Sequence, residues 1–487
     1  MFKLFVRDSV IYAIPALLSK GLALFLVPLY TRVLSPEDYG SLDLLLVFSG
    51  LIALTIALEV SQGIARFYSA ETDPERRCAY ASSAFWFTAL CYSLFAVITL
   101  TYADELSTWI MGREGLTAAF RVGIVYIFFN GLFNLIQNQF RWELRSKHYA
   151  LVSIIVSLVT AGAAVLLTYG AGMGLPGLLW GMSAGVIIGT VYGLYHLRQS
   201  FRFRFDWARL KEMLAFSIPL VPASVTVLAS IYIDRLLINH FVSIGEVGLY
   251  GVAVRLASVV SLVMVGFQGA LTPLIYTYYR EADTPRQLAR IFRVFCGFAL
   301  LTYLALGLFA HDVLVLMTTA DYYSASKLIV FLVPSILLAQ MYIFTPGISI
   351  AKKTHMTIWI NLAGLIANIA LGLILIPRLG GSGAAIAMLL GSSLTFAIYM
   401  LCSQRLYPVP HKWWPLCGSM TATVVALFLA LRLGSELNSY LRWLVNLMFI
   451  SGTAVIFLAL GLVQVSELRK AGQMVRSRLK LFSQRSS

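Results

Sequence analysis

The sequence predicts an all-α integral membrane protein with about fourteen transmembrane helices, and three observations predict it. Hydrophobic residues make up 59% of the 487 residues, whereas charged residues make up only 12%. A soluble domain carries about 25% charged residues. The apolar residues also gather in runs of about 20, the length at which a helix crosses a bilayer. The basic residues, finally, fall mainly in alternate loops, as the positive-inside rule requires.

The predicted spans follow one another with short connections. They lie at 9–31, 41–64, 79–102, 118–140, 149–169, 176–196, 213–240, 247–273, 290–310, 325–349, 356–376, 383–403, 413–431 and 443–464. The first has no A-x-A cleavage site and is interpreted as a retained helix, not a signal peptide. Pro219 and Pro222 open the seventh span and predict a bend there, because proline removes a backbone N–H that neighbouring groups must compensate.

Charge in the loops predicts the orientation. With the N-terminus in the cytoplasm, about 27 basic residues fall on the inner side and about 6 on the outer side. Both termini are therefore expected in the cytoplasm. The net charge of +15 follows mostly from this topology and gives no support for a nucleic-acid partner. The basic tail, 467–487, is expected to contact anionic lipid.

No cofactor is predicted. The five cysteines have no CxxC spacing and no nearby histidine pattern, so neither a disulfide framework nor a metal site is expected. The sequence also lacks the GxxxxGK[ST] loop of ATP-hydrolysing proteins.

An internal repeat predicts the domain organisation. At an offset of about 207 residues, Ser35–Gly40 aligns with Ser243–Gly248, and the polar positions Gln62 and Gln268 also align. His148, which opens the fifth span, aligns with His355, which opens the eleventh. A repeat of this kind is typical of transporters. We expect two parallel six-helix lobes, 1–205 and 206–405, around a central cavity, followed by two additional transmembrane helices, 406–466.

Ionisable residues inside the spans are the candidate functional residues. Asp234 and Arg235 lie within the seventh span, where an ionisable pair is costly and by default marks function. The alternative is a buried ion pair beside a packing kink. Arg255 is expected at a similar depth on the eighth span. Three more lie in the first two spans and at the end of the second: Lys20, Glu59 and Arg66.

The fourth span carries a polar face. Its members recur at helical spacing and are Tyr126, Asn130, Asn134, Gln137, Asn138, Arg141 and Arg145. The arginines at its end favour a hydrated vestibule. The alternative is hydrogen bonding between helices, which asparagine and glutamine side chains supply.

These groups together predict a mostly cationic cavity that attracts an anion, and phosphate is the obvious candidate because arginine engages it bidentately. The predicted substrate-cavity residues are Lys20, Arg66, Asn130, Asn134, Asn138, Arg141, Arg235 and Arg255. Glu59 and Asp234 are candidates for ion coupling. Alternatively, Arg255 pairs with Asp234, Lys20 pairs with Glu59, and Arg66 extends to the interface.

Two regions carry a family resemblance. PLYTRVLSPEDYGSLDLL and EVSQGIARFYSAE in the first half, and SIPLVP, DRLLINHF and EVGLYGVAVRLAS in the second, resemble the polysaccharide-exporting flippases of the multidrug/oligosaccharidyl-lipid/polysaccharide superfamily. The resemblance implies a V-shaped pair of lobes around a cationic cavity. It also implies a place in a bacterial inner membrane, where undecaprenyl-pyrophosphate-linked oligosaccharide is carried from the cytoplasmic to the outer leaflet by alternating access. The family's cavity residues would correspond to Lys20, Arg66, Asp234, Arg235 and Arg255, with Glu59. The extra pair of helices resembles the lipid II flippases.

The leading hypothesis is therefore a flippase and not an enzyme. Its expected partners are a polyprenyl-pyrophosphate-linked glycan, membrane lipid, a proton or sodium gradient, and other glycan-assembly membrane proteins. A cation-coupled multidrug or metabolite antiporter is one alternative, and the cationic residues argue against it. A membrane glycan polymerase or ligase is another, and the short outer loops leave little room for its acceptor.

Overall fold

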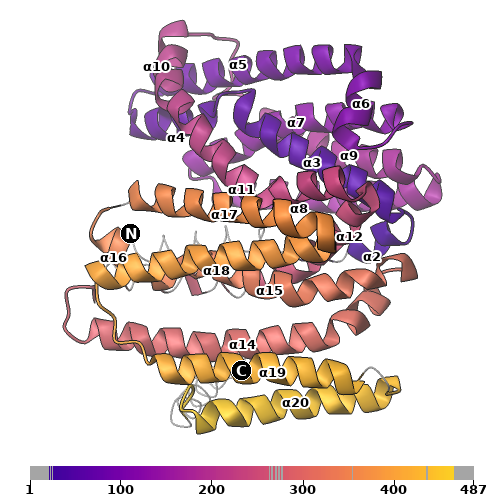
Figure 1. The fold of residues 1–487 in the computed structure, drawn as a ribbon. Helices are drawn as coiled ribbons and strands as arrows, with labels where there is room; N and C mark the ends of the chain where they lie inside the picture. The colour runs from indigo at the N-terminus through magenta and orange to yellow at the C-terminus, as the bar shows by residue number, and fades with distance from the viewer. Residues whose placement is uncertain are drawn as a thin grey trace, which may run out of the picture. The chain divides into compact units, whose positions relative to one another are not determined.

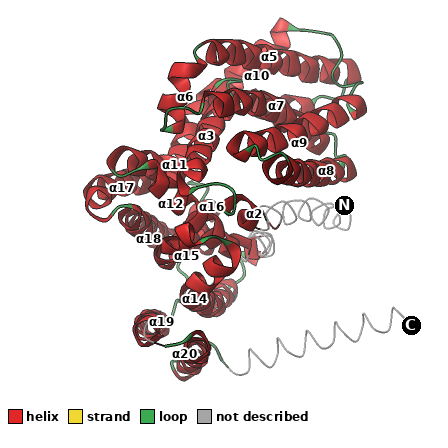
Figure 2. Cartoon of the chain, turned by 90° about the vertical axis from the view of Figure 1, so that its right-hand side faces the viewer, coloured by secondary structure: helices red, strands yellow, loops and turns green. Residues whose placement is uncertain are grey.

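The structure is a computed structural model, and it describes residues 21, 24, 26–262, 264, 267, 268, 271, 275, 278–353, 355–434 and 437–464. Within these ranges the chain forms helices and their connections, with no β-strand (Figure 2). The predicted all-α class is confirmed.

Twelve runs of helix in the described ranges are long and apolar enough to cross a membrane. They match the second to seventh and the ninth to fourteenth predicted spans. The first predicted span, 9–31, lies mostly outside the described residues, and so does part of the eighth, 247–273. The total of fourteen therefore stays a prediction.

The helices of the first half (Figure 1) are α2 (Val27–Thr31), α3 (Pro36–Thr55), α4 (Val60–Ala70), α5 (Pro74–Thr101), α6 (Ala103–Met111), α7 (Thr117–Trp142), α8 (Ser146–Val165), its π-helical end η1 (Leu166–Gly170), α9 (Gly174–His196), α10 (Trp207–Ser217), η2 (Ile218–Leu220), α11 (Val221–Phe241), α12 (Ile244–Ala257) and η3 (Ser258–Val260). The later helices are α14 (Thr284–Met317), η4 (Ala320–Ala325), α15 (Ser326–Gln340), η5 (Met341–Phe344), α16 (Gly347–Ile350), α17 (His355–Leu379), α18 (Gly381–Leu406), α19 (Trp413–Gly434) and α20 (Ser439–Ala459).

The chain forms two compact units. The first unit takes in the chain up to Arg255 together with Val315–Ala325 and Asn368–Ala384. The second takes in Leu256–Leu314, Ser326–Ala367 and the chain from Ala385 onward. The predicted lobes, divided at residue 205, were defined by the internal repeat, whereas these two units are defined by packing. The division into lobes therefore stays a prediction.

In the first unit, α9 packs against α7 and α8 through small residues. Gly181, Gly185, Gly189 and Gly193 recur every fourth residue on α9, so they lie on one face. A Cβ added at Gly181 would lie 2.4 Å from the Ala164 backbone of α8. Small residues let transmembrane helices approach this closely and pack by van der Waals contact.

The predicted second span is broken in the structure. α3 ends at Thr55 and α4 begins at Val60. Between them Leu58 and Glu59 adopt left-handed backbone angles, with φ of 51° and 54°. Such angles are unfavourable for residues other than glycine and persist only where surrounding packing imposes them. The break turns α4 onto α10, where a Cβ at Gly63 would lie 2.8 Å from the Cβ of Met213.

The α-helix of the seventh predicted span is interrupted at the prolines, where the sequence predicts a bend. α10 ends at Ser217, and a short 3₁₀ turn, η2, leads into α11. Pro219 and Pro222 occupy the first turns of η2 and α11, where proline is tolerated because the first N–H groups of a helix need no partner within it.

The aligned motifs at Ser35 and Ser243 adopt the same local structure. The Ser35 Oγ accepts a hydrogen bond from the Asp38 N–H, and the Ser243 Oγ accepts one from the Glu246 N–H, both at 3.2 Å. The glycines that follow, Gly40 on α3 and Gly248 on α12, bring the two backbones together. A Cβ at Gly248 would lie 1.9 Å from the Pro36 carbonyl oxygen.

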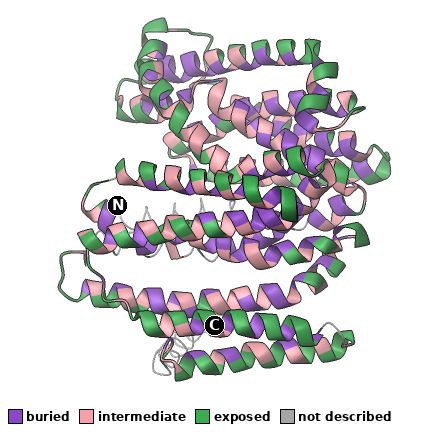
Figure 3. Ribbon diagram, in the orientation of Figure 1, coloured by how far each residue is buried: buried purple, intermediate pink, exposed green. Residues whose placement is uncertain are grey.

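In the second unit, α14 packs along the hairpin of α19 and α20. Their buried contact consists of Leu304, Leu308, Ala426, Leu427 and Ala430. The Asn446 amide donates to the Leu308 carbonyl at 3.3 Å. Many large apolar residues of α19 and α20 are exposed, as expected for helices that face lipid. Much of both ribbons carries the colour of exposed residues (Figure 3).

Candidate functional site

Asp234 lies at the centre of a polar cluster inside the first unit. It is on α11 and only 1% exposed. Its Oδ2 accepts a hydrogen bond from the Tyr250 hydroxyl of α12 at 2.9 Å, and its Oδ1 accepts one from the Asn368 Nδ2 of α17 at 3.1 Å. Three helices therefore meet at one buried carboxylate within an apolar span.

Arg235, the next residue, has a different partner. Its Nε donates to the Asp43 Oδ2 of α3 at 2.8 Å, and its Nη1 donates to the Ile231 carbonyl at 2.9 Å. Arg235 is 5% exposed and Asp43 is 8% exposed. A buried ion pair of this kind is stable only when both charges are matched by good geometry and further hydrogen bonds.

Arg255 on α12 extends the cluster. Its guanidinium lies 5.4 Å from the centre of the Tyr39 ring, one helical turn before Asp43 on α3. A cation over an aromatic face is attracted by the ring quadrupole. Among the described residues, two arginines and two aspartates thus lie together, so the formal charges of this cluster balance.

A second polar site lies beside the break between α3 and α4. A small cavity of about 60 Å³ is lined by Glu59 together with Asn134 and Asn138 of α7. Glu59 is 8% exposed. The structure therefore brings one predicted ion-coupling residue together with two residues of the predicted polar face of the fourth span.

The other predicted residues are spread along the chain. Arg66 is exposed, and its guanidinium lies 4.8 Å from the centre of the Phe216 ring. Arg141 is exposed and donates to the Asn138 Oδ1 at 3.4 Å. Asn130 is half-buried and is not among the residues that line this cavity. Lys20 lies outside the described residues, so its predicted pairing with Glu59 stays untested.

Several predicted polar residues make structural contacts. Gln137 donates to the Ser153 Oγ of α8 at 2.8 Å, which is the helix-to-helix hydrogen bond considered as the alternative. α7 ends at Trp142, so Arg145 leaves the polar face and pairs with Glu143 at 2.9 Å. Gln62 is exposed. Its aligned partner Gln268 donates to the Gln340 carbonyl at 3.3 Å.

Four residues of the cluster around Asp234 were not singled out from the sequence: Tyr39, Asp43, Tyr250 and Asn368. Asp43 carried the same signal as Asp234, an acid inside an apolar helix. Asn368 is a polar residue in the apolar run of α17. Its contact with Asp234 spans 134 positions of the chain, and periodicity within one helix does not predict such a contact.

Solved structures of membrane transporters share this fold. The inward closed conformation of the lipid II flippase MurJ superposes with a TM-score of 0.72 at 15% identity, covering 92% of this chain and 98% of that one. An inward-facing multidrug resistance transporter of the MATE family and MOP superfamily gives a TM-score of 0.65 at 18% identity, covering 79% and 94%. The fold is thus one that multi-pass membrane transporters and flippases adopt.

The family follows from the sequence match. Residues 5–278, more than half of the chain, match the family described as "Polysaccharide biosynthesis protein", and the chain belongs to it. A protein of the Lsg locus of Haemophilus influenzae is 24% identical over 283 residues, which cover 56% of this chain and 67% of that protein. The resemblance identified from the sequence is confirmed at the level of the family and fold.

Proposed function

We propose that the protein is a flippase that carries undecaprenyl-pyrophosphate-linked oligosaccharide from the cytoplasmic to the outer leaflet of the bacterial inner membrane by alternating access. The observation that carries the proposal is membership of the polysaccharide biosynthesis protein family over residues 5–278. A fold shared with a lipid II flippase over 92% of the chain supports it.

Asp234 is our candidate for coupling transport to a proton or sodium ion. A carboxylate this deep in a span is costly and by default functional. The Asn368 Oδ1 beside it is buried and has no hydrogen-bond partner among the described residues. A cation entering here would meet a carboxylate and an amide oxygen, which are suitable ligands for a hard ion. Glu59, in its own cavity with two asparagines, is the second candidate.

The arginines are proposed to act in two ways. Arg66 and Arg141 are exposed near ends of α4 and α7, where a pyrophosphate entering from the cytoplasm would reach them first. Arg235 and Arg255 already face aspartate and tyrosine side chains, so a pyrophosphate would have to compete with these contacts. We propose that this competition couples cargo binding to movement of α3, α11 and α12.

A leaflet assay tests the function. Purified protein is placed in liposomes whose polyprenyl-pyrophosphate oligosaccharide lies in one leaflet, and a membrane-impermeant sugar-modifying enzyme reports how much becomes accessible. We expect protein-dependent exposure with unchanged glycan length, accelerated by an ion gradient. Asp234→Asn should abolish the acceleration, and Arg255→Ala should lower exposure, whereas the exposed Arg121→Ala serves as the control.

The outcomes separate the hypotheses. A longer glycan would indicate a polymerase or ligase. No exposure with several glycans, with or without a gradient, would favour a drug or metabolite antiporter. Full gradient-dependent activity of Asp234→Asn would leave flipping intact and remove Asp234 from the coupling mechanism.

A further inference from the structure

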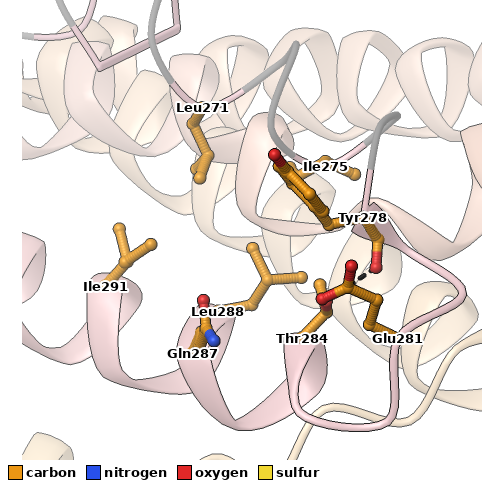
Figure 4. A pocket seen from close by; sticks show the side chains of 8 residues that line it. All are labelled: Leu271, Ile275, Tyr278, Glu281, Thr284, Gln287, Leu288 and Ile291. Atoms are coloured by element: carbon orange, nitrogen blue, oxygen red, sulfur yellow. Dashed lines mark hydrogen bonds between the residues drawn. The ribbon is translucent and has the colours of Figure 1, made fainter.

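The first turns of α14 present two different faces. Arg286, Arg290 and Arg293 are spaced by four and three residues, so they lie on one face of the helix. Leu288 and Ile291 lie on the opposite face and line a pocket of about 290 Å³ whose other walls include Glu281 and Gln287 (Figure 4). The basic residues are therefore gathered on one side and are not distributed around the helix.

The basic face forms one wall of a separate pocket of about 410 Å³ in the second unit. Lys412, from the connection between α18 and α19, lines it with the three arginines of α14, as does Gln464, which follows α20. No acidic side chain is among the described residues that line it. Arg293 is only 8% exposed, so this arginine is buried in the wall of the pocket.

The pocket lies near one end of several membrane-spanning helices. α14 has 34 residues, which at about 1.5 Å each extend well past a hydrocarbon core of about 30 Å. The other walls come from just beyond the ends of α18 and α20 and just before α19. Trp413 and Trp414, which open α19, are 50% and 80% exposed. Exposed tryptophans mark the level of the lipid headgroups.

An apolar stripe leads away from this pocket. Trp413 follows Lys412 directly, and the exposed side chains of Met420, Val424 and Phe428 continue at helical spacing along α19. A soluble anion would use the cations alone, whereas a lipid would use the cations for its headgroup and the stripe for an acyl chain.

From this arrangement we infer that the pocket binds the phosphate headgroup of an anionic phospholipid. Arginine engages phosphate oxygens bidentately, and basic pockets between transmembrane helices recognise anionic headgroups. Binding of a phospholipid at this pocket does not require the transported cargo, so the inference can be tested independently of the proposed flippase activity.

Lipid binding to the purified full-length protein tests this inference. Native mass spectrometry and melting temperatures are measured with short-chain phosphatidylglycerol, with phosphatidylcholine of the same chain length, with inorganic phosphate and with polyprenyl pyrophosphate. The variant Arg286→Gln/Arg290→Gln removes two exposed cations. Lys352→Gln/Lys353→Gln is the matched control, because it removes two exposed charges from the second unit outside the pocket.

We expect phosphatidylglycerol to remain bound and to raise the melting temperature of the wild type and the control, with phosphatidylcholine much weaker. The arginine variant should bind phosphatidylglycerol roughly tenfold or more weakly. Equal binding by both variants would overturn the inference. Stronger retention of polyprenyl pyrophosphate than of phosphatidylglycerol would overturn the inference in favour of a cargo site. Binding of inorganic phosphate without binding of phosphatidylglycerol would overturn it in favour of a soluble-anion site. Lys412→Gln provides the same comparison if the double variant does not fold.

Discussion

At the scale of single residues, Asp234 and Arg235 are adjacent in the sequence but contact different partners. Asp234 is held by neutral donors, whereas Arg235 pairs with Asp43 at 2.8 Å. This separation gives the two residues separable roles, because a substitution at one leaves the hydrogen bonds of the other in place. The pair Asp43–Arg235 is expected to contribute to stability in addition to the proposed part of Arg235 in cargo binding.

We predict that Asp43→Ala or Arg235→Ala alone destabilises the protein strongly, by about 3–5 kcal/mol, because each leaves a buried charge without its partner. The double variant should lose less than the sum of the two single losses. Melting temperatures in detergent and membrane abundance are measured for the wild type, the two single variants and the double variant. Their differences give the coupling free energy between the two side chains. Additive losses would show that the ion pair contributes nothing in itself.

His411 gives a prediction for acid pH. It lies between α18 and α19, where its ring is 4.8 Å from that of Phe292. Burial lowers the pKa of His411 from 6.5 to about 4. The unfolded chain therefore takes up this proton at a higher pH than the folded protein does. Stability should be fully present above pH about 6.5 and should be lost as the pH falls toward 4.

His411→Phe keeps a ring and removes the titrating group. Neither ring nitrogen of His411 has a hydrogen-bond partner among the described residues, so the substitution breaks no such bond there. We expect the melting temperature to fall less between pH 7 and pH 5 in this variant than in the wild type. Parallel declines in both proteins would assign the acid sensitivity to other groups.

Individual site residues were predictable only in part. The rule that an ionisable residue in a span marks function selected Asp234, Arg235 and Glu59 as candidates, and all three are buried in the structure. It applied equally to Asp43, which was missed. Pairing was less predictable, since the Asp43–Arg235 contact joins residues 192 positions apart. Such contacts depend on how the helices pack, and a single sequence carries no pattern that specifies this packing.

At the scale of the elements, hydrophobic runs predicted the spans closely because the bilayer fixes their length and polarity. The prolines predicted the interruption before α11 for a similarly local reason. The break at Leu58 and Glu59 was not predicted, because neither position carries the proline or glycine that would signal an interruption. Local propensity opposes its left-handed angles, and the helix that follows, α4, packs closely on α10.

The contact between α3 and α12 yields the prediction at this scale. A Cβ at Gly248 would lie within 1.9 Å of a backbone oxygen, so even alanine forces the helices apart. We expect Gly248→Ala to destabilise the protein by about 1–3 kcal/mol, as overpacking does. Gly162→Ala on α8 is the control, because its Cβ would meet nothing within 4 Å. Equal melting temperatures of the two variants would contradict this account.

At the scale of the whole molecule, the distribution of charge predicts the orientation of every helix. The loop between α4 and α5 is expected inside and the loop between α6 and α7 outside, because basic residues resist translocation across the membrane. The orientation matters for mechanism, since it places the exposed Arg66 and Arg141 on the side where lipid-linked cargo is assembled in the proposed function.

Cysteine labelling tests this orientation directly. In a background without the five native cysteines, Thr72→Cys and Glu114→Cys each place one thiol at an exposed position, one in each loop. A membrane-impermeant maleimide on spheroplasts should label Glu114→Cys at once and Thr72→Cys only after permeabilisation. The reverse pattern would invert the chain, put Arg66 and Arg141 on the outer face, and require cargo to enter from the opposite side. Labelling that matches the expectation would place Arg66 and Arg141 on the cytoplasmic side. Under the proposed function the cargo site must then open first toward the cytoplasm, because the lipid-linked substrate is made in that leaflet.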